Sequence, residues 1–171
     1  MIDNVVSFAI EKTATVESPR AFETIVYGGL AVGVLDGSAA VILSSLRGVS
    51  PTRVFQYIAS AVLGRESYQG GLATALLGVL FHFLIAFSVA TVFYFVSQKL
   101  PLLTRQAVAC GMLYGVIVYF AMQYVVLPLS LVNKGPFSFQ AMIQGMIVHA
   151  LCVGLPVALI ARWSASLQTK P

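Results

Sequence analysis

The sequence predicts an all-α membrane protein, a four-transmembrane up-down helix bundle with an interfacial amphipathic helix between spans one and two. Of the 171 residues, 58% are hydrophobic and only 9% are charged, and the mean hydropathy is +0.90. Soluble domains contain roughly 25% charged residues, so this chain lacks the polar surface of a soluble fold. The apolar residues fall into four long stretches. The length fits one domain, so we expect residues 1–171 to form a single transmembrane domain.

The first span begins with a recognisable start signal. Ser18-Pro19 pairs a capping residue with proline at the first helical position and predicts a span over residues 22–46, which Arg47-Gly48 ends. Before it, residues 2–11 fit either a short surface helix or a frayed terminus. Charged residues interrupt residues 1–20, so we expect the first span, rather than a cleaved leader, to direct insertion.

The next helix repeats the start signal with Ser50-Pro51 and is predicted over residues 51–63. It is too short to cross the ~30 Å hydrocarbon core of a bilayer. Phe55, Ile58 and Val62 share one face of it. We therefore expect a helix that lies at the interface or enters it shallowly, with this face toward apolar surroundings.

Three further apolar stretches predict the remaining spans. The second covers residues 71–96 and is ended by polar Ser97-Gln98-Lys99. The third covers residues 105–127 and is ended by Pro128. The fourth covers residues 139–161, directly after the capping residue Ser138.

Four spans with short loops place both chain ends on one side of the membrane. We count six Lys and Arg residues on that side and four on the other. The six are Lys12, Arg20, Lys99, Arg105, Arg162 and Lys170, and the four are Arg47, Arg53, Arg65 and Lys134. Because cytoplasmic loops are enriched in Lys and Arg, we expect both termini in the cytoplasm.

The net charge of +4 and the pI of about 9.3 come from basic residues scattered among the loops. Nucleic-acid-binding proteins carry a basic stripe, so we expect these charges to meet anionic lipid headgroups, with no nucleic acid as partner. Cys110 and Cys152 fall inside apolar spans without a CxxC pairing. We interpret both as small packing residues.

Three ionisable residues lie near the middle of the apolar stretches, at similar depth: Asp36, His82 and His149. Placing an ionisable side chain at the bilayer centre costs roughly 2.5–3.5 kcal/mol on insertion scales, so such residues usually have a partner or a function. The three are the candidate site residues.

Each of the three shares a face with small residues, which mark helix contacts in membranes. Gly33 and Gly37 flank Asp36, a row of Gly71, Ala75 and Gly78 leads to His82, and Ala141 and Gly145 lead to His149. We therefore expect the three side chains to point into the bundle. On the third span, Tyr119 and Gln123 lie one turn apart and are the best candidates to join this polar network. Pro156 predicts a kink in the fourth span, because it has no N–H to donate.

Two interpretations of the cluster stand side by side. A buried Asp–His hydrogen bond between helices could lock their register, at roughly 0.6–2 kcal/mol per bond. Alternatively, the cluster could bind a small ligand or relay protons in transport, since Asp and His chains form such relays. Four spans are few for a complete transporter, so that role requires a homo-oligomer or a larger membrane complex. The loops could also dock a partner, which would make the chain an accessory subunit.

A third class is a cofactor site. His82 and His149 lie on spans two and four, which are diagonal in a four-helix ring, and could ligate a haem iron such as that of haem b. Asp36, His82 and His149 also have suitable ligand types for a metal ion. No arginine lies near that depth to meet haem propionates, and the three residues are single positions on three helices, so no cofactor is predicted.

Catalytic motifs such as GxSxG or HExxH are absent from the sequence, so the chain has no predicted catalytic residues.

The chain resembles a family of uncharacterised four-span bacterial inner-membrane proteins that is distantly YagU-like. The resemblance covers residues 25–163, and it implies a bacterial cytoplasmic membrane location but no mechanism. It rests on Gly28-Gly29 and Asp36; Arg47-Gly48-Val49-Ser50-Pro51 with Gln56, Ile58-Ala59-Ser60 and Leu63-Gly64; Gly70-Gly71 and His82-Phe83; Pro101; Gly111 and Tyr114-Gly115; Pro128-Leu129-Ser130; and Gly145, His149 and Gly154-Leu155-Pro156.

Overall fold

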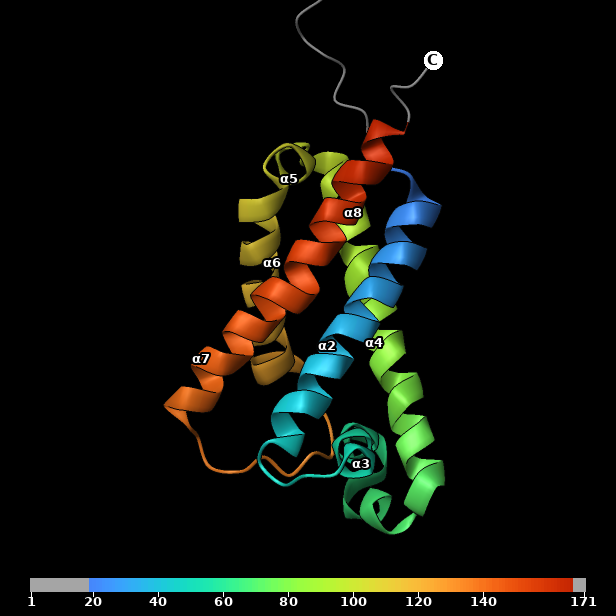
Figure 1. Ribbon diagram of the computed structural model, residues 1–171, viewed down its shortest axis with the longest axis vertical. Coiled ribbons are helices and arrows are strands. Elements are labelled where there is room, and N and C mark those ends of the chain that lie inside the picture. The colour runs from blue at the N-terminus through green and yellow to red at the C-terminus, as the bar shows by residue number, and fades with distance from the viewer. Residues whose placement is uncertain (1–18, 168–171) are drawn as a thin grey trace, which may run out of the picture.

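The protein is an all-helical bundle of four long helices that run in alternating directions (Figure 1). The structure is a computed structural model that describes residues 19–167, so the segment 2–11 lies outside the described residues. Four helical stretches are long and apolar enough to cross a membrane: Glu23–Ser45, Gly71–Lys99, Ala107–Val126 and Phe139–Ser166. The predicted fold class is thereby confirmed, and the chain is a multi-pass membrane protein.

Three of the four spans contain a turn of wider π-helical winding. The first span consists of η1 (Glu23–Tyr27) and α2 (Gly28–Ser45), and the second is the single helix α4 (Gly71–Lys99). The third consists of α6 (Ala107–Ala121) and η3 (Met122–Val126). The fourth consists of α7 (Phe139–Val148), η4 (His149–Gly154) and α8 (Leu155–Ser166). The connecting helices are α3 (Pro51–Leu63), the 3₁₀ helix η2 (Gly64–Gln69) and the short α5 (Leu102–Arg105).

Two spans extend past their predicted ends because buried serines continue the helix. Ser97 is buried, and its hydroxyl donates to the carbonyl of Tyr94 within the same helix, so α4 runs on to Lys99. Ser164 is also buried, and its hydroxyl hydrogen bonds with that of Thr24 at 2.9 Å. This contact holds α8 against the first span and places the two ends of the described chain side by side.

Helix α3 lies across the end of the bundle opposite these chain ends (Figure 1). Its start is as predicted, since the Ser50 hydroxyl accepts a hydrogen bond from the Arg53 N–H. Its polar side also faces the protein, because Gln56 and Ser60 are buried. Gln56 donates from Nε2 to the carbonyl of Gly71 at 2.9 Å, so the helix uses its polar side to attach to the start of α4.

The four spans form a ring in which α4 and α6 are the neighbours that make the fewest contacts with each other. α2 packs against α4 and against the fourth span, and α6 packs against the fourth span. α4 and α6 are joined nearer the chain ends, where the rings of Phe93 and Tyr114 lie 5.0 Å apart and the Tyr114 hydroxyl donates to the Val89 carbonyl at 2.7 Å. The main hydrophobic core lies in this half, around Phe93, Val157 and neighbouring alanines.

Glycines allow α6 and the fourth span to meet backbone to backbone. A Cβ atom at Gly154 would lie 1.9 Å from the carbonyl oxygen of Gly111, and one at Gly115 would lie 2.1 Å from the carbonyl oxygen of His149. No side chain fits at these points. Such close approach is the usual form of helix association in lipid, where hydrophobic burial does not drive packing.

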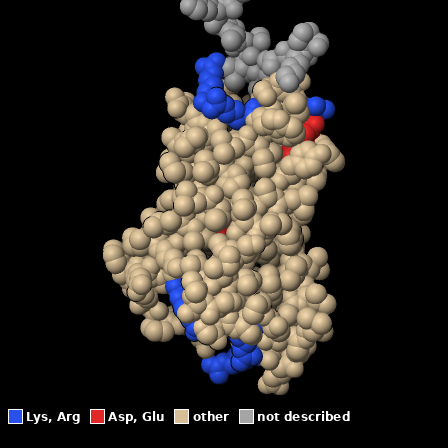
Figure 2. Space-filling view, in the orientation of Figure 1, with Lys and Arg blue, Asp and Glu red and all other residues tan. Residues whose placement is uncertain are grey.

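Charged residues gather at the two ends of the bundle. Figure 2 shows Lys and Arg at both ends and, between them, a broad band without charges apart from one small acidic spot near its middle. Arg20 and Glu23 form an ion pair of 3.1 Å at the end where the described residues begin. A central apolar band between two charged ends is the surface expected of a bundle that spans a bilayer.

Candidate functional site

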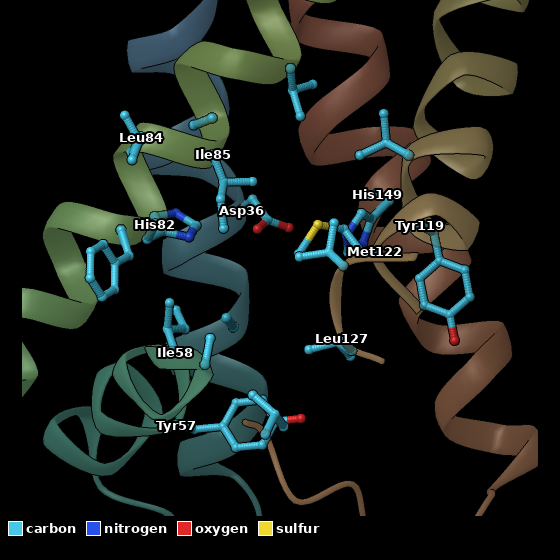
Figure 3. Close-up of a pocket in the computed structure, with 18 of the residues that line it drawn as sticks. Asp36, Tyr57, Ile58, His82, Leu84, Ile85, Tyr119, Met122, Leu127 and His149 are labelled. Atoms are coloured by element: carbon cyan, nitrogen blue, oxygen red, sulfur yellow. The ribbon is translucent and has the colours of Figure 1, made fainter. Parts of the chain in front are cut away.

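Helix α2 presents Asp36 to the interior at mid-depth (Figure 3). The residue lies between Gly33 and Gly37, which are both buried. An aspartate has poor helix propensity, but α2 is anchored by its tight contacts with α4, so local preference does not decide its structure. The Asp36 side chain is half-buried, and its carboxylate has no hydrogen bond or ion pair with any described residue.

His82 on α4 packs directly against α2. Its Nε2 donates to the carbonyl oxygen of Gly33 at 2.8 Å, and the edge of its ring occupies the space left by the missing side chain of Gly37. The rings of Phe55 and Phe83 contact it edge-on. His82 is only 9% exposed. With Nε2 acting as donor to a carbonyl, the neutral imidazole keeps a free lone pair on Nδ1.

His149 begins the π-helical turn η4 of the fourth span. Its Nδ1 donates to the carbonyl of Gly145 at 3.0 Å, which leaves a lone pair on Nε2 in the neutral ring. The π winding lies directly before Pro156, where the missing N–H breaks the α-helical pattern. The sequence predicted a kink at this proline, and the structure places a widened turn there that carries His149.

Tyr119 and Gln123 occupy neighbouring turns of the third span. The Tyr119 ring lies edge-on to the His149 ring at 5.4 Å and fills the space beside Gly145, where a Cβ atom would be 2.4 Å from the ring. Its hydroxyl points away from Asp36 (Figure 3). Tyr119 therefore positions the His149 ring by packing. Gln123 lies in η3, just past the end of α6, and lines the same space.

All five candidate residues line one cavity of about 590 Å³, which we call the central cavity. Its other walls are mainly apolar side chains of α2, α3, α4, α6, η3 and the segment that follows η3, with Ser44 and Tyr57 as polar exceptions. The volume lies within the roughly 300–1,000 Å³ of typical small-molecule sites. Figure 3 shows Asp36 at the back of this space, with His82 on one side and His149 on the other.

The central cavity opens sideways where α4 and the third span diverge. Four residues that line it are also well exposed on the outside: Leu84 of α4 is 61% exposed, Val62 of α3 is 58%, Tyr57 of α3 is 40% and Val126 of η3 is 39%. Leu84 lies close to the midpoint of α4. The mouth of the cavity is thus mainly apolar, with the Tyr57 hydroxyl toward the α3 end, and at Leu84 it faces the middle of the apolar band.

The side chains of the cluster share the cavity without bonding one another. Each histidine donates to a backbone carbonyl, and among residues 19–167 no hydrogen bond joins Asp36 to His82 or His149. Within this described range, no group of three or more His, Cys, Asp and Glu side chains is arranged to hold a metal ion.

Sequence reasoning did not identify the contribution of α3. Tyr57, Ile58 and Val62 of this helix form one end of the central cavity. Burial raises the pKa of the Tyr57 hydroxyl, and the neighbouring Tyr68 raises it further, so the group stays protonated and neutral. The amphipathic face of α3 was visible in the sequence, but nothing in the pattern indicated that this face closes a cavity.

The fold and site together define a four-span membrane protein with a laterally open cavity around an aspartate. Comparison with known proteins found no matching family model, no matching curated protein and no matching solved structure. The YagU-like resemblance therefore stays a prediction.

Proposed function

We propose that this protein binds a small molecule in the central cavity, with Asp36 as the polar group that fixes it and His82 and His149 beside it. The observation that carries the proposal is the Asp36 carboxylate, which faces a cavity of about 590 Å³ without a hydrogen-bond partner among the described residues. A half-buried charge at mid-bilayer depth without a protein partner is costly unless something else satisfies it.

The two other roles for the cluster have less support. The structural lock predicted from the sequence is an Asp–His hydrogen bond, and neither histidine bonds Asp36. His82 does link α4 to α2 through the Gly33 carbonyl, but Asp36 takes no part in that bond. A proton relay requires a continuous chain of titratable groups to water, whereas the residues that line the central cavity around the cluster are mostly aliphatic. Ligand binding accounts for the cavity itself, whereas neither the structural lock nor the proton relay requires a cavity.

The binding proposal predicts saturable photolabelling inside the cavity. The probe is a neutral trifluoromethyl-diazirinyl benzyl alcohol, used on the full chain in phosphatidylcholine nanodiscs. Labelling at Met122, which lines the cavity, should saturate, whereas labelling at Leu113, which is 62% exposed outside it, should rise in proportion to the probe. Filling the cavity by Ala40→Phe should reduce Met122 labelling about tenfold, equivalent to about 1.4 kcal/mol of binding free energy.

The matched control is Ala39→Phe. Ala39 is half-buried on the same helix but does not line the central cavity, so this variant should leave Met122 labelling unchanged. Met122 labelling that never saturates in the unmodified protein, or that survives Ala40→Phe, would rule out the binding proposal.

We also propose that the protein lies in a bacterial cytoplasmic membrane with both chain ends in the cytoplasm. The four described Lys and Arg residues at the terminal end equal the four at the α3 end, and Lys12 and Lys170, outside the described residues, tip the balance. Reporter domains fused after Lys170 and inserted in the loop at Asn133–Pro136 should report opposite sides of the membrane, with the Lys170 fusion inside. A loop reporter found in the cytoplasm would refute this orientation.

A further inference from the structure

We propose that the central cavity is selective for hydrophobic organic cations, that is, for an apolar molecule carrying a protonated amine. This inference rests on the proposed binding function and names its ligand class. It follows from the kinds of polar atoms that face the cavity, from the charges around them and from the position of the mouth.

Ser44, Tyr57, Tyr119 and Gln123 add uncharged polar groups to the cavity wall. The cluster itself presents acceptors. An ionised Asp36 carboxylate only accepts hydrogen bonds, and a neutral histidine that donates its N–H to a carbonyl, as His82 does to Gly33 and His149 to Gly145, can only accept at its other ring nitrogen. A ligand that satisfies these groups must supply N–H or O–H donors. A protonated amine supplies up to three donors and the opposite charge, and charge-assisted hydrogen bonds are roughly twice as strong as neutral ones.

The charges around the cavity favour the same ligand. Asp36 is the only acidic residue among those that line it, and no Lys or Arg is among them. Two basic groups at the α3 end of the bundle are engaged there, since Arg47 donates to the Gln144 side chain and Lys134 donates to the Gln123 carbonyl. In the low-dielectric interior of a bundle, an uncompensated carboxylate attracts a cation far more strongly than it does in water.

The walls and the mouth define the rest of the ligand. Apart from the cluster, the lining is mainly aliphatic and aromatic, including Ile58, Ile85 and Met122. The exposed Leu84 places the mouth in the apolar band. The body of the ligand must therefore be apolar, and it can enter from the bilayer while its amine travels to Asp36.

A matched pair of photoprobes tests this selectivity. The trifluoromethyl-diazirinyl benzyl alcohol is compared with the benzylamine of the same shape, which is protonated at neutral pH. Both are used on the full chain in nanodiscs of zwitterionic phosphatidylcholine, and Met122 labelling is normalised to lipid-facing Leu113 to remove differences in partitioning. We expect half-saturation at about tenfold lower concentration for the amine than for the alcohol. Asp36→Asn should abolish that preference, so that amine and alcohol half-saturate at similar concentrations, and its helical circular dichroism in micelles shows whether the variant is folded.

The control is Glu23→Gln, the same acid-to-amide change at a residue paired with Arg20 outside the cavity, and it should keep the preference. Equal half-saturation for amine and alcohol in the unmodified protein would overturn the inference and leave the binding proposal standing. A preference that persists in Asp36→Asn would likewise overturn it. Failure of both probes to saturate would instead remove the binding proposal itself. If Asp36→Asn does not fold, the comparison of the two probes on the unmodified protein decides alone.

Discussion

Replacing Gly154 by alanine should separate the third and fourth spans and cause a large loss of stability for a single added methyl group. The new Cβ atom would lie 1.9 Å from the Gly111 oxygen and 2.4 Å from the Gly115 nitrogen. Both are backbone atoms, so no side chain can turn aside to make room. Overpacking costs typically 1–3 kcal/mol, and we expect a loss of about 3 kcal/mol or more in the free energy of unfolding.

The measurement is equilibrium unfolding of the purified protein in mixed micelles by titration with a denaturing detergent. The matched control is Gly135→Ala, where a Cβ atom would meet nothing within 4 Å, so the stability should change by no more than about 0.5 kcal/mol. Equal stability of the two variants would show that the backbone contact at Gly154 does not exist as described.

Replacing Gly78 by alanine should detach α3 from α4. The added Cβ atom would lie 1.9 Å from the Phe55 carbonyl oxygen and 2.6 Å from its carbon, and both atoms again belong to backbone. α3 is attached to α4 on this side, where Gln56 bonds the Gly71 carbonyl. Because α3 forms one end of the central cavity, its release would open the cavity there.

Cysteine labelling reports this movement. In a background with Cys110→Ala and Cys152→Ala, a cysteine at Ser60, which is 2% exposed, should react slowly with a water-soluble maleimide in micelles. Gly78→Ala should raise the rate of this reaction about tenfold. A tenfold rise corresponds to a decrease of about 1.4 kcal/mol in the free energy needed to open α3 away from α4. A cysteine at exposed Thr52 gives the rate for full exposure and should not respond. Continued protection of position 60 would show that α3 stays in place.

The helices could be predicted because their signals are local. Ser50-Pro51 and the following amphipathic face define α3 with its observed bounds, and apolar length alone identifies the four spans. The predicted ends of the second and fourth spans were wrong for a physical reason. A serine reads as polar in the sequence, but Ser97 satisfies its hydroxyl within its own helix and Ser164 finds Thr24 across the bundle, so both can be buried.

That Asp36, His82 and His149 face one interior space could be predicted, but the openness of that space could not. Small-residue faces place Asp36, His82 and His149 inside, because only a close-packed face carries such rows in lipid. Whether these side chains bond to one another depends on the distance between helices. That distance is set by tertiary contacts, such as the Gly115 approach to the His149 backbone and the divergence of α4 from the third span, which no single-helix pattern contains.

The position of the cavity mouth determines which concentration a ligand experiences. At Leu84 the mouth faces hydrocarbon, so the relevant reservoir is the bilayer, and occupancy follows the mole fraction of the molecule among the lipids. A strongly partitioning amphiphile would fill the cavity at very low aqueous levels. Adding protein-free vesicles at a constant total amount of ligand would then dilute the ligand in lipid. The occupancy of the cavity would fall, although neither the protein nor its intrinsic affinity for the ligand had changed.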